Sequence, residues 1–190
     1  ASFFNKDKKD VTEEDISIIK NQYEKDWNEW PADIGAPYYD IDKDGEYNPD
    51  VDVPGVPGAL QTLWIDYNDD LSESNYGSIP IGLEIQETYW AYTNQDPIGN
   101  VIYKKVDIIY KGTTDSRIDS MYICQWSDTD LGKSSDDFIG CDTTLNLGFT
   151  YNSNDPDADY IQFDLAPPAV GYTIIQGVSR YTGNNSDSAI

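Results

Sequence analysis

Histidine is absent from the 190-residue sequence. Catalysis by histidine, Ser-His-Asp triads and histidine-ligated zinc sites are therefore excluded. Cysteine occurs only as Cys124 and Cys141, which are too few for a structural zinc site. The two thiols fit either one disulfide that clamps the acidic segment between them or a pair of unlinked thiols, and the sequence leaves both alternatives open.

Basic residues and long apolar runs are also scarce. The chain has 12 Lys and Arg against 35 Asp and Glu, which gives a net charge of −23. Phosphate groups would be repelled at this charge, so we expect neither nucleic acid nor an anionic membrane surface as a partner. Because no run reaches the roughly 18 apolar residues of a membrane helix, direct membrane insertion is not expected either.

The acidic residues that are present are mostly of one type, with 27 Asp against 8 Glu. Aspartate favours turns and loops, whereas glutamate is the better helix former, so the charge is expected to lie in loops. The sequence also contains 15 Tyr and 5 Trp. Aromatic and β-branched residues without long helix-forming tracts indicate strands.

One helix and several strands are predicted. Thr12 is a suitable N-cap for an amphipathic helix that ends before Pro31, and its apolar stripe, Ile16, Ile19, Tyr23 and Trp27, is expected to dock on the main domain. The predicted strands are 60–67, 79–92, 101–111, 117–126, 145–151, 160–165 and 170–178.

This pattern predicts an all-β fold, a two-sheet antiparallel β-sandwich of Ig-like or jelly-roll type with one N-terminal helix and long Asp-rich loops. Residues 1–30 would form an N-terminal extension that contains the amphipathic helix, and residues 31–190 a calcium-binding β-sandwich. Since the chain starts at Ala1 without a signal peptide, we expect it to be a processed or trimmed piece of a longer protein.

The first candidate metal site is the sequence DIDKDG at residues 40–45. Asp40, Asp42 and Asp44 alternate along the chain, and Gly45 permits the turn that would bring their carboxylates together around calcium. An EF-hand would have glutamate at the twelfth position, which here is Val51, and the prolines that follow forbid a second helix. We therefore predict a calcium loop of related local shape, with Asp50 and Asp52 as further candidate ligands.

The second candidate metal site lies in the stretch 127–152, around which we take the fold to be organised. Like charges in one compact loop repel each other unless a cation lies among them, and calcium is the cation that oxygen ligands in an irregular loop suit best. The candidate ligands are Asp128, Asp130, Asp136, Asp137 and Asp142. Two further acidic corners, 66–70 and 152–159, contain Asp and Asn that either join an ion site or act as ordinary turn residues.

Several of these motifs together resemble a region of large proteins that bacteria export by the type IX secretion system. The resemblance rests on residues 26–49, 81–92, 101–113 and 121–152, and most specifically on the succession DxDLG at 128–132, DD at 136–137 and NLGFxYN at 146–152. It implies a non-catalytic β-sandwich module that is secreted and extracellular, at the cell surface.

The favoured hypothesis is a calcium-stabilised structural or adhesive module, which includes a subunit of a surface filament or layer whose partners are neighbouring subunits. The alternative is a carbohydrate-binding module that holds glycans on exposed aromatic residues. An enzyme, as part of a secreted hydrolase, is the least favoured class. Glu84 and Glu87 are three residues apart on a predicted strand, so they would lie on opposite faces and would not form a glycosidase pair.

Overall fold

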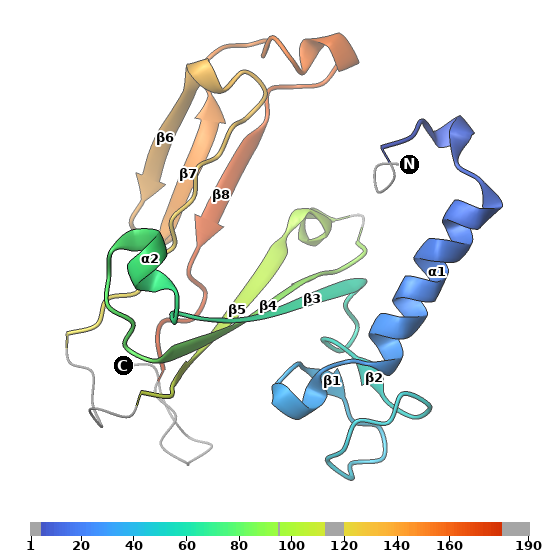
Figure 1. The fold of residues 1–190 in the computed structure, drawn as a ribbon. Helices are drawn as coiled ribbons and strands as arrows, with labels where there is room; N and C mark the ends of the chain where they lie inside the picture. The colour runs from blue at the N-terminus through green and yellow to red at the C-terminus, as the bar shows by residue number, and fades with distance from the viewer. Residues whose placement is uncertain (1–4, 95, 113–119, 180–190) are drawn as a thin grey trace. The chain divides into compact units, whose positions relative to one another are not determined.

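The structure, a computed structural model, describes residues 5–94, 96–112 and 120–179. The chain divides into two compact units, Ala1–Asp119 and Ser120–Ile190. The strands lie in three antiparallel sheets, and one long helix precedes them (Figure 1). The predicted all-β class, with antiparallel sheets and one long N-terminal helix, is therefore confirmed, although the described strands form three sheets and not two. The predicted division after residue 30 stays a prediction.

The main sheet of the first unit is a meander of three strands, β3 (Gln61–Asn68), β4 (Leu83–Ala91) and β5 (Ile102–Tyr110). These strands correspond to three of the predicted ones, although β4 begins at Leu83 and not at residue 79. The short helix α2 (Ser72–Tyr76) lies in the connection from β3 to β4. Asp69 closes this connection, because its carboxylate accepts the backbone N–H groups of Ile81, Gly82 and Leu83 at 2.7–3.2 Å.

One face of this sheet is covered by the irregular segment that precedes it. The side-chain amide of Gln86 donates to the carbonyl of Ile34 (2.8 Å), and the hydroxyl of Thr62 accepts the N–H of Val56 (2.9 Å). Gly35 lies so close that a Cβ there would stand 2.5 Å from Oε1 of Gln86, and its φ of 119° is one that other residues rarely adopt. The segment is thus fixed to the sheet by polar contacts.

A buried carboxylate lies among the residues of the opposite face. Glu87 on β4 forms an ion pair with Lys104 on β5 (2.8 Å) and accepts the hydroxyl groups of Tyr67 and Tyr89. Burial alone would raise the pKa of Glu87, but the hydrogen bonds from Lys104, Tyr89 and Tyr67 outweigh it and lower the pKa below its usual value. The carboxylate therefore stays charged and links the three strands.

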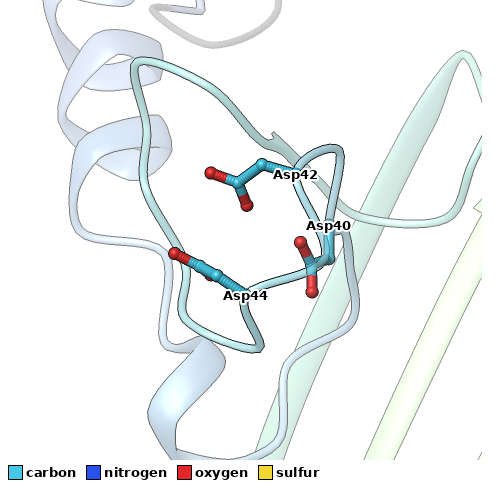
Figure 2. Close-up of side chains that lie close together, drawn as sticks. All are labelled: Asp40, Asp42 and Asp44. Carbon is cyan, nitrogen blue, oxygen red and sulfur yellow. The ribbon is translucent and has the colours of Figure 1, made fainter.

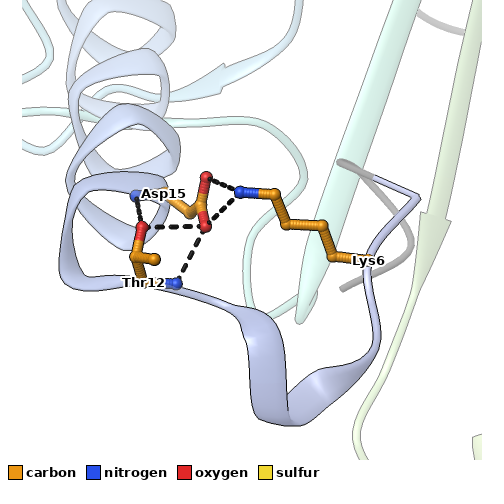
Figure 3. A network of polar contacts seen from close by, with 3 residues as sticks. All are labelled: Lys6, Thr12 and Asp15. Carbon is orange, nitrogen blue, oxygen red and sulfur yellow. Dashed lines mark hydrogen bonds and ion pairs between the residues drawn. The ribbon is translucent and has the colours of Figure 1, made fainter.

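The long helix α1 (Glu13–Asn28) begins where the sequence predicts it. Thr12 is its N-cap and forms a reciprocal capping box with Asp15, whose carboxylate also accepts both hydrogen bonds from Lys6 at 2.8 Å (Figure 3). The Lys6 hydrogen bonds, followed by the Thr12 backbone N–H, lower the pKa of Asp15 to about 2. The first four N–H groups of a helix have no acceptor within the helix. Here the Thr12 hydroxyl accepts the N–H of Asp15, and the Asp15 carboxylate accepts the N–H of Thr12.

The apolar stripe of α1 is not docked as predicted. Within the described residues, Ile16 is 37% exposed, Tyr23 63% and Trp27 41%, and only Ile19 is partly buried. The helix is held instead at its C-terminal end, where the indole N–H of Trp27 donates to the carbonyl of Pro49 (3.0 Å) and the hydroxyl of Tyr47 donates to the carbonyl of Trp27 (2.6 Å). Polar contacts with one loop replace the expected apolar packing.

The sheet of the second unit contains β6 (Asp137–Asp142), β7 (Leu147–Asn152) and β8 (Ala169–Thr173), in that order. The strands β7 and β8 correspond to two predicted ones, although β8 ends at Thr173 and not at residue 178. Sequence reasoning missed β6 because its aspartates were assigned to a loop. Both thiols of the chain, Cys141 on β6 and Cys124, are free and exposed.

Two predicted strands of this unit are wrong. The stretch 117–126 begins with three residues outside the described ones, and residues 120–126 contain no strand. Tyr122 is 93% exposed and Trp126 76%, so the face that the alternation predicts to be buried is exposed. The stretch 160–165 forms the 3₁₀ turn Ile161–Phe163, because Asp157 accepts the N–H of Tyr160 (2.8 Å) and Asp164 then adopts a left-handed conformation.

The capping box generates the first prediction. Replacement of Thr12 by Ala removes the side-chain acceptor and should destabilise the first turn of α1 by about 1 kcal/mol. Amide hydrogen exchange at residues 13–16 should then become about fivefold faster, while exchange in β4 stays unchanged. Thr12→Ser is the matched control, since it keeps the hydroxyl. Equal exchange in the Ala and Ser variants would show that the hydroxyl does not hold the helix start.

Candidate metal centre

The predicted calcium loop is closed at its base by a short antiparallel pair. Strand β1 (Tyr38–Tyr39) pairs with β2 (Val53–Pro54), so residues 40–52 form a closed loop between them. Tyr38 also contacts Tyr47 within the loop, with ring centroids 5.4 Å apart in an edge-to-face arrangement. The pairing of β1 with β2 brings the two ends of an otherwise irregular segment together.

Asp52 holds the inside of this loop. It is 1% exposed, and its two oxygens accept the backbone N–H groups of Ile41 (2.9 Å) and Asn48 (2.8 Å). A buried carboxylate needs such donors, since burial without them is costly. The sequence named Asp52 as a candidate ligand, and the structure shows that it braces the backbone from which the other carboxylates project.

Asp40, Asp42 and Asp44 converge in this loop, as their spacing predicts (Figure 2). One carboxylate oxygen from each lies within 4.8 Å of those from the other two. Calcium–oxygen distances are about 2.3–2.6 Å, so two ligands of one ion can be about 5 Å apart. The spacing of these three oxygens therefore suits a shared calcium ion.

The backbone of the loop fixes two of these side chains. Asp40 accepts the N–H groups of Lys43 (2.6 Å) and Gly45 (3.0 Å), and Asp44 accepts the N–H of Glu46 (2.8 Å). Gly45 has a φ of 81°, and a Cβ there would meet nothing within 4 Å. The glycine is thus required by the backbone conformation and not by lack of space, as in calcium loops that turn sharply at this position.

The three carboxylates repel one another. Desolvation, and next the charge of Asp44, raise the pKa of Asp42 above its usual value. Burial, followed by the charges of Asp40 and Asp52, likewise raises the pKa of Tyr38. The proximity of like charges thus destabilises the loop, and a bound cation would remove this repulsion. Among the three carboxylates, the raised pKa of Asp42 shows the effect most clearly.

The remaining predicted ligands are not brought together in the same way. Asp50 is exposed in the same loop but does not belong to the cluster, and Asp128 and Asp130 are exposed in the irregular segment before β6. Among the described residues, the only group of three acidic side chains with oxygens this close is Asp40, Asp42 and Asp44. The aspartates of the second unit are thus close together in the sequence, but the described ones do not form a cluster of three carboxylates.

The strand that sequence reasoning missed separates Asp142 from Asp136 and Asp137. Asp137 begins β6 and Asp142 ends it, so about 16 Å lies between them at the usual rise of a strand. Asp142 instead accepts the N–H groups of Thr144 (2.9 Å) and Leu145 (3.2 Å) in the turn to β7. These hydrogen bonds, with that of the Thr144 hydroxyl first, lower the pKa of Asp142. Asp142 cannot share an ion with Asp137.

Alternative sites receive little support from the geometry. Glu84 and Glu87 lie on opposite faces of β4, where Glu84 forms an ion pair with Lys111 and Glu87 one with Lys104. Trp90 stacks on Tyr103 at a centroid distance of 5.4 Å and is half-buried. The most exposed aromatic residues among those described, Tyr76, Tyr122 and Trp126, belong to segments outside the strands. They do not form the row on a sheet that glycan binding by stacking requires.

Comparison with protein-family models, with curated proteins and with solved structures gave no match. The resemblance to a region of type IX-secreted proteins therefore stays a prediction. Within the described part of the chain, no helix has the length and apolar character needed to cross a membrane. The geometry of the Asp40–Asp44 loop is thus the main basis for a functional proposal.

The repulsion within this loop generates the second prediction. Since the pKa of Asp42 is raised in the fold, its proton is held more tightly there than in the unfolded chain, and the calcium-free loop loses stability as pH rises through that pKa. Asp44→Asn removes a nearby charge and should lower the pKa of Asp42. A carboxyl-carbon NMR titration without calcium measures it, with Asp33→Asn as the control. An unchanged pKa in Asp44→Asn would contradict the proposed coupling.

Proposed function

We propose that this chain is a non-catalytic, calcium-stabilised structural or adhesive module of the bacterial cell surface. The observation that carries the proposal is the convergence of Asp40, Asp42 and Asp44 in a loop whose ends are held by β1 and β2. All three offer hard oxygen ligands, which calcium prefers and which softer metals do not select. The proposed role of the ion is to fix the loop and so present a rigid surface.

A structural role for the ion fits the way the loop is connected. The same loop carries Tyr47 and Pro49, to which the C-terminal end of α1 is tied by hydrogen bonds. Ordering the loop would therefore also fix the position of the helix end. An ion that binds only the folded chain adds its binding free energy to the stability of the fold.

Secretion and a surface location are part of the proposal. A net charge of −23 keeps a chain apart from nucleic acids and anionic membranes, and extracellular fluids contain enough calcium to fill sites of modest affinity. Three of the four residues in the apolar stripe of α1, Ile16, Tyr23 and Trp27, are exposed. Exposed apolar surface of this kind is typical of contacts with other proteins, which agrees with a subunit of a filament or layer.

The proposal is tested by thermal unfolding in millimolar calcium and in excess EDTA. Calcium at one hundred times its dissociation constant adds about 2.7 kcal/mol, which should raise the unfolding midpoint by about 5–10 °C. Asp42→Ala should lose the part of this rise that the Asp40–Asp44 loop supplies. In EDTA the same variant should unfold at or above the wild-type midpoint, because removal of Asp42 relieves repulsion among the carboxylates.

Asp33→Ala is the matched control, since Asp33 is an exposed aspartate of the same unit outside the loop. It should keep the full calcium response. The proposal is wrong if wild-type protein unfolds at the same temperature in calcium and in EDTA. A calcium response that Asp42→Ala retains in full would mean that the Asp40–Asp44 loop is not the site.

A further inference from the structure

Three buried oxygen atoms at one end of the second unit's sheet have no hydrogen-bond donor among the described residues. They are Oδ1 of Asp136, Oδ1 of Asp137 and Oδ1 of Asn152. Each exposes less than 1 Å². A carboxylate or amide oxygen can only accept hydrogen bonds, so each of these atoms requires a donor or a positive charge.

The second polar atom of each side chain forms a hydrogen bond within the protein. Oδ2 of Asp136 accepts the side-chain amide of Asn154 (2.5 Å), and Oδ2 of Asp137 accepts the N–H of Leu131 (2.8 Å). The amide nitrogen of Asn152 donates to the carbonyl of Asn154 (2.6 Å). A carbonyl cannot donate, so this bond determines which end of the Asn152 amide is oxygen. All three side chains are thus held in place with one oxygen left over.

Strand pairing brings these residues together. Asp137 and Asn152 are direct partners across β6 and β7, so their Cβ atoms are about 5 Å apart on one face. Asp136 precedes Asp137, and its carbonyl accepts the N–H of Ser153 (2.9 Å). The three oxygens therefore come from residues that are adjacent in the fold, although Asn152 is 15 residues from Asp137 in the sequence.

A further carboxylate, that of Asp157, joins the loop before β6 to the loop after β7. Asp157 is fully buried and accepts the N–H groups of Lys133 (3.1 Å), Asp159 (2.9 Å) and Tyr160 (2.8 Å). Burial would raise the pKa of Asp157, but these three backbone hydrogen bonds outweigh it and lower the pKa. With all its oxygens supplied with donors, Asp157 differs from the three side chains beside it.

This contrast indicates what the site lacks. A buried acceptor without a donor costs about 1–3 kcal/mol, and more when it is charged. Three such atoms on residues that the strand register brings together, two of them on carboxylates, offer hard oxygen ligands with a charge of −2. A divalent cation neutralises that charge and uses all three oxygens at once, with water or backbone carbonyls as the remaining ligands.

We propose that Asp136, Asp137 and Asn152 hold a calcium ion at the end of the β6–β7 pair. This rests on the proposed function, because it assigns the ion of the second unit to particular atoms. It also replaces the ligand set expected from the sequence, since Asp142 lies at the far end of β6 and Asn152 takes its place. The ion joins the loop 130–136 to the loop 153–160, on either side of Asp157.

The test is a count of bound calcium by equilibrium dialysis of the full chain. The double variant Asp136→Asn and Asp137→Asn should bind one calcium ion fewer per chain than wild type. The control is Asp142→Asn with Asp164→Asn, which removes two charges from the same unit away from the site and should bind as many ions as wild type. Asp42→Ala with Asp44→Ala reports on the loop of the first unit.

These variants separate the two proposals. If the Asp136 and Asp137 variant binds as much calcium as wild type while the Asp42 and Asp44 variant binds less, the second-unit site is wrong and the proposed function stands. If the Asp42 and Asp44 variant binds as much as wild type while the other binds less, the first-unit site is wrong and the second-unit site stands. Binding of no calcium by wild type overturns both.

A second measurement needs no substitution in the new site and therefore does not depend on whether the double variant folds. In the Asp42→Ala chain, calcium at one hundred times its dissociation constant should slow amide hydrogen exchange at residues 131–137 and 152–160 by up to about 100-fold. Exchange that calcium leaves unchanged in both segments would overturn the site and assign the three oxygens to water.

Discussion

This structure depends most on hydrogen bonds in which an aspartate carboxylate accepts backbone N–H groups. Asp52, Asp69 and Asp157 each accept two or three of them, and each thereby holds together a segment that lies outside the strands. Among the described residues, Ala36 and Leu131 are the only buried apolar residues, and the two fully buried side chains are Asp52 and Asp157. The loops are thus organised by charged hydrogen bonds more than by a hydrophobic core, which also explains why aspartate, whose short side chain reaches its own backbone, outnumbers glutamate.

The aspartates fall into two groups that differ in what their oxygens contact. In Asp69 and Asp157, backbone donors outweigh burial and lower the pKa, so these side chains need no further partner. Asp42 has a raised pKa because it is desolvated next to Asp44. Asp136 and Asp137 keep buried oxygens without donors among the described residues. The aspartates of the first kind stabilise the loops directly. Those of the second kind lower the stability of the fold, and a divalent cation bound to their oxygens would raise it.

The sequence predicts most of the regular elements, because they depend on local patterns. Thr12 with the acidic first turn locates α1, and the alternation bounded by turn residues locates β3 and β5. Docking of α1 and the strands at 120–126 and 160–165 were predicted wrongly, since an apolar pattern does not reveal whether a partner surface lies opposite. The strand β6 was missed because its own sequence does not have the pattern of a strand. Its terminal aspartates are typical of loops, and only pairing with β7 makes the segment a strand.

The same distinction decides which candidate metal ligands can be found from the sequence. In the loop 40–45, alternate carboxylates and a glycine act within one turn, so spacing along the chain is enough to bring them together. In the second unit the residues that come together belong to two strands, and the register of β6 against β7 selects Asn152 as the neighbour of Asp137. Counting acids along the chain therefore favoured Asp128 and Asp142, which lie elsewhere. A site formed across strands becomes visible only through the buried oxygens that pairing leaves without donors, and such atoms are the better signal in acidic β proteins of this kind.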